Sequence, residues 1–459
     1  MSSTALVGDV LSAAEAGGLG AARSQMALSL GWHIIVACLG VGMPAITVFA
    51  EWRGHRTGDV QYRLLARRWA KAMGVLFAVG AVSGTILSFE MGLLWPGMMG
   101  TYGQVIGLPF SLEGIAFFIE AIFLGVYLYA WDRLPARQHM LTALPILVAG
   151  VASAFFVVAA NAWMQQPVGF QMRGGRVVAV DPWEAMFNPA TPPQTVHMIL
   201  AAFMVAGFLM ASVYAVAMLR GRRDRYHRLG FLVPFTIAAL VTPVQIGVGD
   251  WAAHFVADNQ PVKLAAMEGV FDTARGVPLH VGGIAVDGEM RYALEIPRGL
   301  SLLAHFDPDA QVAGLNEVPA RDRPPVNITH WAFQIMVGCG FALLALSAWL
   351  GLVWRRRKRL PGTRWFLRAA ALSGPAAVLA LESGWVVTEV GRQPWIVYRV
   401  MRTSEAVNPA PGVVWGFVVV SVVYLVLTVA TVYVLRRLAR AQPVPIAPQE
   451  RDVTEFKVV

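Results

Sequence analysis

A short stretch at the end of a long apolar run carries the residues whose types and spacing are most suggestive of chemistry. Glu382, Trp385 and Glu389 are three and four residues apart, so both carboxylates and the indole share one face of a helix. A carboxylate in hydrocarbon costs roughly 2.5–3.5 kcal/mol, so acids in such a run usually meet a cation, a metal or a water-filled path. Arg392 follows Glu389 by three residues and offers an ion pair at the helix end. The spacing alone leaves an ion pair and a functional site equally open.

The composition indicates that this run crosses a membrane. Of 459 residues, 56% are hydrophobic and only 14% are charged, and several apolar runs reach the ~20 residues that span a bilayer. The net charge is +9, but the basic residues gather in short clusters between the apolar runs, as the positive-inside rule predicts. We therefore predict an all-α polytopic membrane protein and no binding of nucleic acid.

The apolar pattern predicts nine membrane-spanning helices whose connections alternate in charge. The expected spans are residues 28–50, 72–94, 109–131, 140–163, 194–219, 230–255, 329–353, 366–389 and 412–435. Basic residues follow each odd-numbered span, so these connections are expected in the cytoplasm and the N-terminus outside. Residues 1–435 are expected to form one transmembrane domain, with a long outer loop at 256–328 and a cytoplasmic tail at 436–459.

Four potential metal ligands on four different predicted helices fall at a similar depth. His33, His197 and Met336 lie near the predicted outer ends of their spans, and Glu389 ends its own span. Taken singly, a histidine near a helix end is usually an interfacial anchor, and a methionine usually contributes packing. Chance would scatter the four over both leaflets, so their shared depth favours a common site near the outer face.

Several segments resemble subunit I of the cytochrome bd family of quinol oxidases. They are Arg23-Ser-Gln-Met-Ala-Leu-Ser-Leu-Gly-Trp-His33, Asn161-Ala-Trp-Met-Gln-Gln-Pro-Val-Gly169 with the following Thr195-Val-His197, Phe333-Gln-Ile-Met-Val-Gly338, and Gly384-Trp-Val-Val-Thr-Glu-Val-Gly-Arg-Gln-Pro-Trp395. The resemblance runs from about residue 23 to residue 435. It implies the fold, the cofactors and the roles of individual residues that follow.

The resemblance implies three hemes held by side chains of this chain. His197 and Met336 would ligate a low-spin heme b, since an imidazole with a thioether gives six-coordinate iron. His33 and Glu389 would ligate two adjacent high-spin hemes, one b and one d, whose single protein ligand leaves a position for O2. Which of the two residues holds heme d stays open. Trp385 would lie between hemes. The sequence contains no Cys-x-x-Cys-His, so any heme is bound non-covalently.

Two residues of the outer loop resemble the pair carried by the family's quinol-binding loop. They are Lys263 and Glu268, which without the resemblance would be a solvated pair, because a spacing of five does not favour a helical ion pair. An exposed carboxylate on the outer face could accept the protons that leave quinol with its electrons. One departure from the family is Gln334, where many relatives have a basic residue two positions before the methionine.

Acidic residues within the spans are candidates for proton transfer. Glu113 and Glu120 are seven residues apart and so on one face of the third span, which has no lysine or arginine. They match glutamates thought to bring protons to the heme pair in the family, and pairing with neighbouring helices is the alternative. Glu90 and Asp250 are expected to be further buried acids, with no role assigned.

The resemblance predicts subunit I of a bd-type terminal oxidase in a bacterial cytoplasmic membrane. Such a subunit oxidises quinol at the outer face, reduces O2 to water and contributes to the proton gradient, together with a second membrane subunit. A polytopic transporter with glutamates along its substrate path is one alternative, and a b-type electron carrier without oxygen chemistry is another. Transporters often show paired halves and broken helices, and neither is visible in this sequence.

Overall fold

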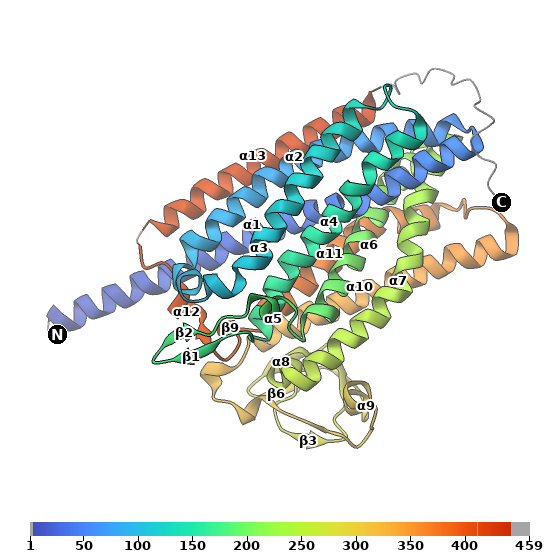
Figure 1. Cartoon of the computed structure of the whole chain (residues 1–459). Coiled ribbons are helices and arrows are strands. Elements are labelled where there is room, and N and C mark those ends of the chain that lie inside the picture. Colours follow the sequence, from blue (N-terminus) through green and yellow to red (C-terminus); the bar gives the residue numbers. More distant parts are fainter. Residues whose placement is uncertain (1–2, 411, 442–459) are drawn as a thin grey trace.

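The computed structural model describes residues 3–410 and 412–441 (Figure 1). Within this described part, nine helices are long and apolar enough to cross a membrane. They are α1 (Ser3–Thr57), α2 (Val60–Leu94), α3 (Pro96–Tyr129), α4 (Ala136–Gln165), α6 (Thr191–Leu219), α7 (Arg225–Asn259), α10 (Val326–Arg357), α11 (Arg364–Val390) and α13 (Val413–Arg440). The predicted all-α class with nine spans is confirmed. The predicted tail at 436–459 begins inside α13, and residues 442–459 lie outside the described part.

Several helices extend beyond the predicted spans. α2 begins at Val60 and α3 at Pro96, well before the predicted residues 72 and 109. Nearly all of residues 95–108, between the predicted second and third spans, is therefore helical. Apolar runs mark only the part of a helix that lies in hydrocarbon, whereas its end is set by capping. The Asp59 side chain accepts the backbone N–H of Gln61 at the start of α2, and a proline in the first turn of α3 lacks only an N–H that would have no helical partner.

The short elements gather at one end of the helix bundle (Figure 1). Between α4 and α6 lie β1 (Gln171–Arg173), β2 (Arg176–Val178) and α5 (Pro182–Met186), and between α11 and α13 lie β9 (Trp395–Val397), β10 (Met401–Arg402) and α12 (Thr403–Ala406). The connection from α7 to α10 lies at the same end. The connections thus alternate between the two ends of the bundle, as predicted. Assigning the loop-rich end to the outer face rests on the basic residues at the opposite end.

The connection between α7 and α10 is a folded unit. It contains α8 (Pro261–Glu268), β3 (Ala274–Arg275), β4 (Leu279–Val281), β5 (Ile284–Val286), β6 (Glu289–Arg291), β7 (Leu294–Ile296), α9 (Gly299–His305), β8 (Gln311–Val312) and the 3-10 turns η1 (Leu315–Glu317) and η2 (Ala320–Asp322). Antiparallel pairs join β3 to β8, β4 to β7 and β5 to β6. Leu264, Val277, Leu300 and Val312 are buried together in its own small core. This core gives the side chains of α8 defined positions.

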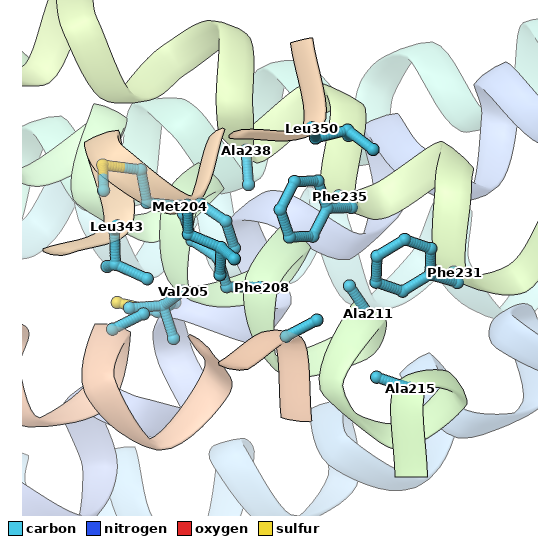
Figure 2. Close-up of a cluster of buried hydrophobic side chains, with 14 of the residues drawn as sticks. Met204, Val205, Phe208, Ala211, Ala215, Phe231, Phe235, Ala238, Leu343 and Leu350 are labelled. Carbon is cyan, nitrogen blue, oxygen red and sulfur yellow. The ribbon is translucent and has the colours of Figure 1, made fainter. Parts of the chain in front are cut away.

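Close packing between α6, α7 and α10 builds the core of the bundle (Figure 2). The ring of Phe235 lies 5.4 Å from that of Phe208 and 5.0 Å from that of Phe231, between centroids. A Cβ on Gly207 would lie 2.7 Å from the Cβ of Ala238, so only glycine allows α6 and α7 to approach this closely. The positions of side chains on α6 relative to α7 are therefore well defined.

Candidate functional site

The end of α11 holds Glu389 between two polar side chains. Arg392 donates from Nη2 to Oε2 at 2.5 Å, and Asn161 of α4 donates from Nδ2 to Oε1 at 2.6 Å. The ion pair that the spacing allowed is thus present. Arg392 is only 2% exposed, and its Nε and Nη1 have no partner among the described residues. Burial lowers the pKa of the Arg392 guanidinium, while the charge of Glu389 acts in the opposite direction. These two nitrogens make the buried cation ready to bind a further anionic group.

Earlier in α11, Trp385 and Glu382 face α1. A Cβ on Gly31 would lie 3.2 Å from Oε2 of Glu382 and 3.6 Å from Cζ3 of Trp385. The indole Nε1 and the Glu382 Oε1 are buried with no hydrogen-bond partner in the described part of the chain. The structure therefore turns the predicted carboxylate and indole face toward the helix that carries His33.

Each of the other three predicted ligands lies against a glycine of a neighbouring helix. The pairs are His33 with Gly84 of α2, His197 with Gly249 of α7, and Met336 with Gly384 of α11. In each pair, an atom of the His or Met side chain lies 2.9–3.3 Å from the point where a Cβ on the glycine would be. Any larger residue would press on the ligand side chain, so the glycines keep space around it. Two imidazoles, a thioether and a carboxylate are donors that suit heme iron, and the residues present fit that group.

Polar neighbours orient the two histidine rings. Nδ1 of His33 lies 2.7 Å from the Oγ of Ser83, which itself can donate to the carbonyl of Gly80 at 3.1 Å. Ser83 can thus accept a hydrogen bond from Nδ1–H, which leaves Nε2 as the nitrogen for a metal. The Nε2 of Gln245 lies 3.3 and 3.2 Å from the two ring nitrogens of His197. Sequence reasoning missed Ser83 and Gln245, although each is a polar residue within an apolar run.

Lys263 and Glu268 are buried, so the expectation of a solvated pair with an exposed carboxylate is wrong. Each is 4% exposed. The Lys263 Nζ donates to Oε1 of Gln165 at 3.1 Å and to the carbonyl of Thr388 at 3.3 Å. The carboxyl Oε2 of Glu268 has no partner in the described part. α8 ends at Glu268 and is capped by Gly269, whose φ of 68° suits glycine, and this tight end keeps Glu268 within the folded loop.

Burial shifts the pKa values of both residues toward neutrality. It raises the pKa of Glu268 to about 8. For Lys263, burial lowers the pKa to about 7, with Arg392 acting in the same direction and Glu389 opposing. Groups whose charge changes near neutral pH are suited to exchanging protons with a substrate.

A cavity of about 270 Å³ opens beside Lys263 and Arg392. Trp395 and Tyr398 also line it, and the exposed Arg399 lies at its rim. Glu268 is not among the lining residues. The structure therefore separates the predicted pair, with Lys263 directed toward the end of α11 and Glu268 elsewhere on α8.

The acidic residues of α3 lead toward a polar cluster at the other end of the helix. Glu120 is buried, and its carboxyl group lies 3.7–3.8 Å from the point where a Cβ on Gly150 of α4 would be. Glu113 is half-buried. Seven residues beyond Glu120, Tyr127 donates to Oε2 of Glu51 at 2.6 Å. The equal spacing puts all three α3 side chains on one face. The sequence did not indicate Glu51, because its partners come from distant helices.

Two further acids differ from each other in burial. Glu90 is 3% exposed, and its Oε1 accepts hydrogen bonds from Nε2 of Gln25 and Oγ of Ser29, both at 2.9 Å. The prediction that Asp250 is buried is wrong, because its side chain is 56% exposed and lies 3.5 Å from Nδ1 of His254. Asp250 lies within the last turns of α7, close to the folded connection that follows this helix.

Comparison with known proteins decides between the functions that this geometry allows. Residues 21–443 match the family model of cytochrome bd terminal oxidase subunit I. The chain belongs to this family. It is therefore a heme-containing quinol oxidase subunit of a bacterial membrane, with quinol and O2 as substrates and a second subunit as partner. The transporter and the electron carrier without oxygen chemistry are set aside.

Individual relatives cover almost the whole of this bd oxidase subunit. It is 39% identical to a putative cytochrome bd menaquinol oxidase subunit I from Bacillus subtilis, over 92% of this chain and 97% of that one. It is 30% identical to the cytochrome bd ubiquinol oxidase subunit 1 of the same organism, over 91% and 92% of the two chains. A solved bd oxidase from Geobacillus thermodenitrificans is 40% identical with a TM-score of 0.86, covering 93% of this chain and 99% of that chain.

Proposed function

We propose that this bd oxidase subunit holds two b hemes and one d heme through the four predicted ligands. His197 and Met336 would hold the low-spin heme b, and His33 and Glu389 would hold the high-spin pair. The observation that carries this proposal is the set of glycines that face the rings of His33 and His197 and the sulfur of Met336. When bound, these hemes supply electron transfer and the reduction of O2.

The protein side chains orient and enclose the cofactors. Ser83 holds Nδ1 of His33 and leaves Nε2 free of this contact, so Nε2 would be the nitrogen that ligates a heme. Trp385 presents a buried indole N–H with no partner among the described residues, between α1 and α11, where it would lie between hemes. Nε and Nη1 of Arg392, which have no partner in the described part of the chain, would bind an acidic substituent of a heme, since a buried cation favours an anion.

Glu268 would accept a proton from quinol at the outer face, with Lys263 as the second polar residue of the loop. A carboxylate whose pKa lies near 8 is a stronger base than an ordinary one, and its ionised fraction rises as the pH rises through that value. Glu113 and Glu120 would bring protons to the oxygen site from the cytoplasm. The subunit would thereby take up and release protons on opposite sides of the cytoplasmic membrane and contribute to the proton gradient.

Residues 1–435 would form one heme-binding transmembrane domain, with the loop at 256–328 as its quinol site. Only 6% of the most apolar window of α13 is buried within this chain. An apolar face of this kind is not stable in water, so lipid or the second subunit must cover it.

Met336→Leu is expected to alter one b heme and leave the others in place. Leucine keeps the volume of methionine but removes the thioether, so the low-spin heme should become high-spin or fall in reduction potential. Visible spectra and a redox titration of the purified oxidase would measure this change. Met204→Leu, in the core between α6 and α7, is a matched control that should leave the spectrum unchanged. An unaltered low-spin heme in Met336→Leu would remove this residue from the site.

Quinol oxidation is expected to rise with pH through about 8. Glu268 must be ionised to take a proton, and its ionised fraction increases as the pH rises through its raised pKa. The measurement is kcat/KM for quinol from about pH 6 to about pH 9, at constant ionic strength. Glu268→Gln should abolish this rising limb. A wild-type profile that is flat over this range would contradict the role of Glu268 as base.

A further inference from the structure

One face of α10 carries three polar side chains that all bond to the backbone of the outer loop. Asn327, His330 and Gln334 are spaced by three and four residues, so they form a stripe along one side of the helix. Asn327 accepts the N–H of Ala285 at 2.8 Å and donates to the carbonyl of the same residue at 3.0 Å. The first turns of α10 therefore hold the loop directly.

His330 is the centre of this stripe. It is fully buried, and its two ring nitrogens lie 2.7 Å from the carbonyl oxygen of Met267 and 2.9 Å from that of Gly282. One turn further along, Gln334 donates to the carbonyl of His280 at 3.0 Å. The position where many relatives carry a basic residue thus holds a neutral side chain that is bonded to the loop.

These bonds converge on the end of α8, where Glu268 lies. The last carbonyls of a helix have no partner within it. His330 bonds the carbonyl of Met267, and Nδ1 of His280 donates to the carbonyl of Glu268 at 2.8 Å. Two histidines therefore cap the helix end that carries Glu268, and Gln334 in turn holds His280.

The opposite side of α10 carries Met336. This residue is six positions after His330, or about 9 Å along the axis, and it faces Gly384 of α11. A single rigid helix thereby connects the cap of α8 with the predicted ligand of the low-spin heme. The distance from the base to the electron acceptor is then set by hydrogen bonds at the start of α10.

We propose that His330, supported by Gln334 and His280, is a positioning residue for quinol oxidation, which holds the Glu268 end of α8 at a fixed place on α10. The inference rests on the proposed function of Glu268 as the base. It adds residues that act on the backbone of the loop and do not touch quinol.

The test uses the complete oxidase with His330→Ala, which removes the imidazole ring and its contacts with the carbonyls of Met267 and Gly282. We expect kcat for quinol to fall roughly tenfold, as for the loss of buried hydrogen bonds, while an artificial donor that reduces the hemes directly still supports normal oxygen consumption. The rising limb of the pH profile should also move to lower pH, because a loosened loop admits water to Glu268 and reduces the desolvation that raised its pKa. Burial is the cause of the raised pKa of Glu268, and the variant leaves the other side chains of the loop unchanged.

Two matched variants support the interpretation. His330→Gln keeps an N–H donor at this place and should restore part of the quinol activity. His305→Ala, in α9 of the same loop, removes a half-buried histidine outside the stripe and should behave as the wild type. Equal losses of quinol-driven and artificial-donor activity in His330→Ala would overturn the proposal, because they would mean that His330 supports the heme region.

Glu268→Gln, measured in parallel, separates the two hypotheses. In one outcome, Glu268→Gln loses quinol activity, whereas His330→Ala keeps it and shows the pH profile of the wild type. The positioning role of His330 is then wrong, and the assignment of Glu268 as the base stands. If Glu268→Gln keeps full activity, the base assignment fails. In that case, amide hydrogen exchange across residues 265–282 tests whether His330 stabilises the end of α8. Faster exchange in His330→Ala supports the cap, and unchanged exchange refutes it.

Discussion

Glu268→Gln is expected to lower quinol-driven oxygen consumption by about 10²–10⁴-fold, the range for loss of a general base. The substitution keeps the shape of the side chain and its hydrogen-bonding capacity but removes the group that takes up a proton. Because Glu268 is 4% exposed, water does not replace it as base without rearrangement of the loop. Oxygen consumption with quinol as donor measures this effect directly.

Two comparisons make the Glu268→Gln result specific. An artificial donor that reduces the hemes directly should still support oxygen consumption in this variant. Glu295→Gln alters a 60% exposed carboxylate of the same loop and should retain quinol activity. A parallel loss with both donors would show that the loop supports the heme region and that the quinol assignment is wrong.

The membrane fold was accessible from the sequence because its signal is local. Apolar runs and the basic clusters between them predicted nine spans and the alternation of their connections. Helix ends were not accessible in this way. The start of α2 at Val60 depends on a cap by Asp59, and the start of α3 at Pro96 follows α2 almost directly. Hydropathy reveals neither feature, because it indicates which residues can lie in the hydrocarbon layer and not where the backbone hydrogen bonds of a helix begin.

The chemistry of the outer loop was less accessible, because burial there depends on distant segments. Lys263 and Glu268 belong to a polar stretch of sequence and were expected in solvent. In the structure, Gln165 of α4 and the end of α11 enclose Lys263, and the cap from α10 holds the chain around Glu268. The error for Asp250 has the opposite sign, because this acid near the end of a long span was predicted to be buried and is exposed. In each case the sequence identified the residue type, whereas the tertiary contacts decided the environment.

The neighbours of the predicted ligands show the same limit. Motif resemblance selected His33, His197 and Met336, but it said nothing of the residues opposite them. Gly84 and Gly384 contribute through the absence of a side chain, and Gln245 is one polar residue in a long apolar helix. Their significance follows only from which helices pack together, so spacing within one segment cannot reveal it.

Glu120→Gln is expected to reduce oxygen consumption by about 10²-fold with either electron donor. Glutamine preserves volume and hydrogen bonding but cannot carry a proton, so delivery along α3 to the oxygen site should fail while the low-spin heme stays normal. The two donors separate this variant from Glu268→Gln, which should affect quinol-driven turnover alone. Glu90→Gln is the matched control, because Glu90 is an equally buried acid on α2 whose Oε1 is already hydrogen-bonded to Gln25 and Ser29. Full turnover in Glu120→Gln would refute the relay, whereas equal losses in both variants would show that any buried acid in this bundle is needed for folding and not for proton transfer.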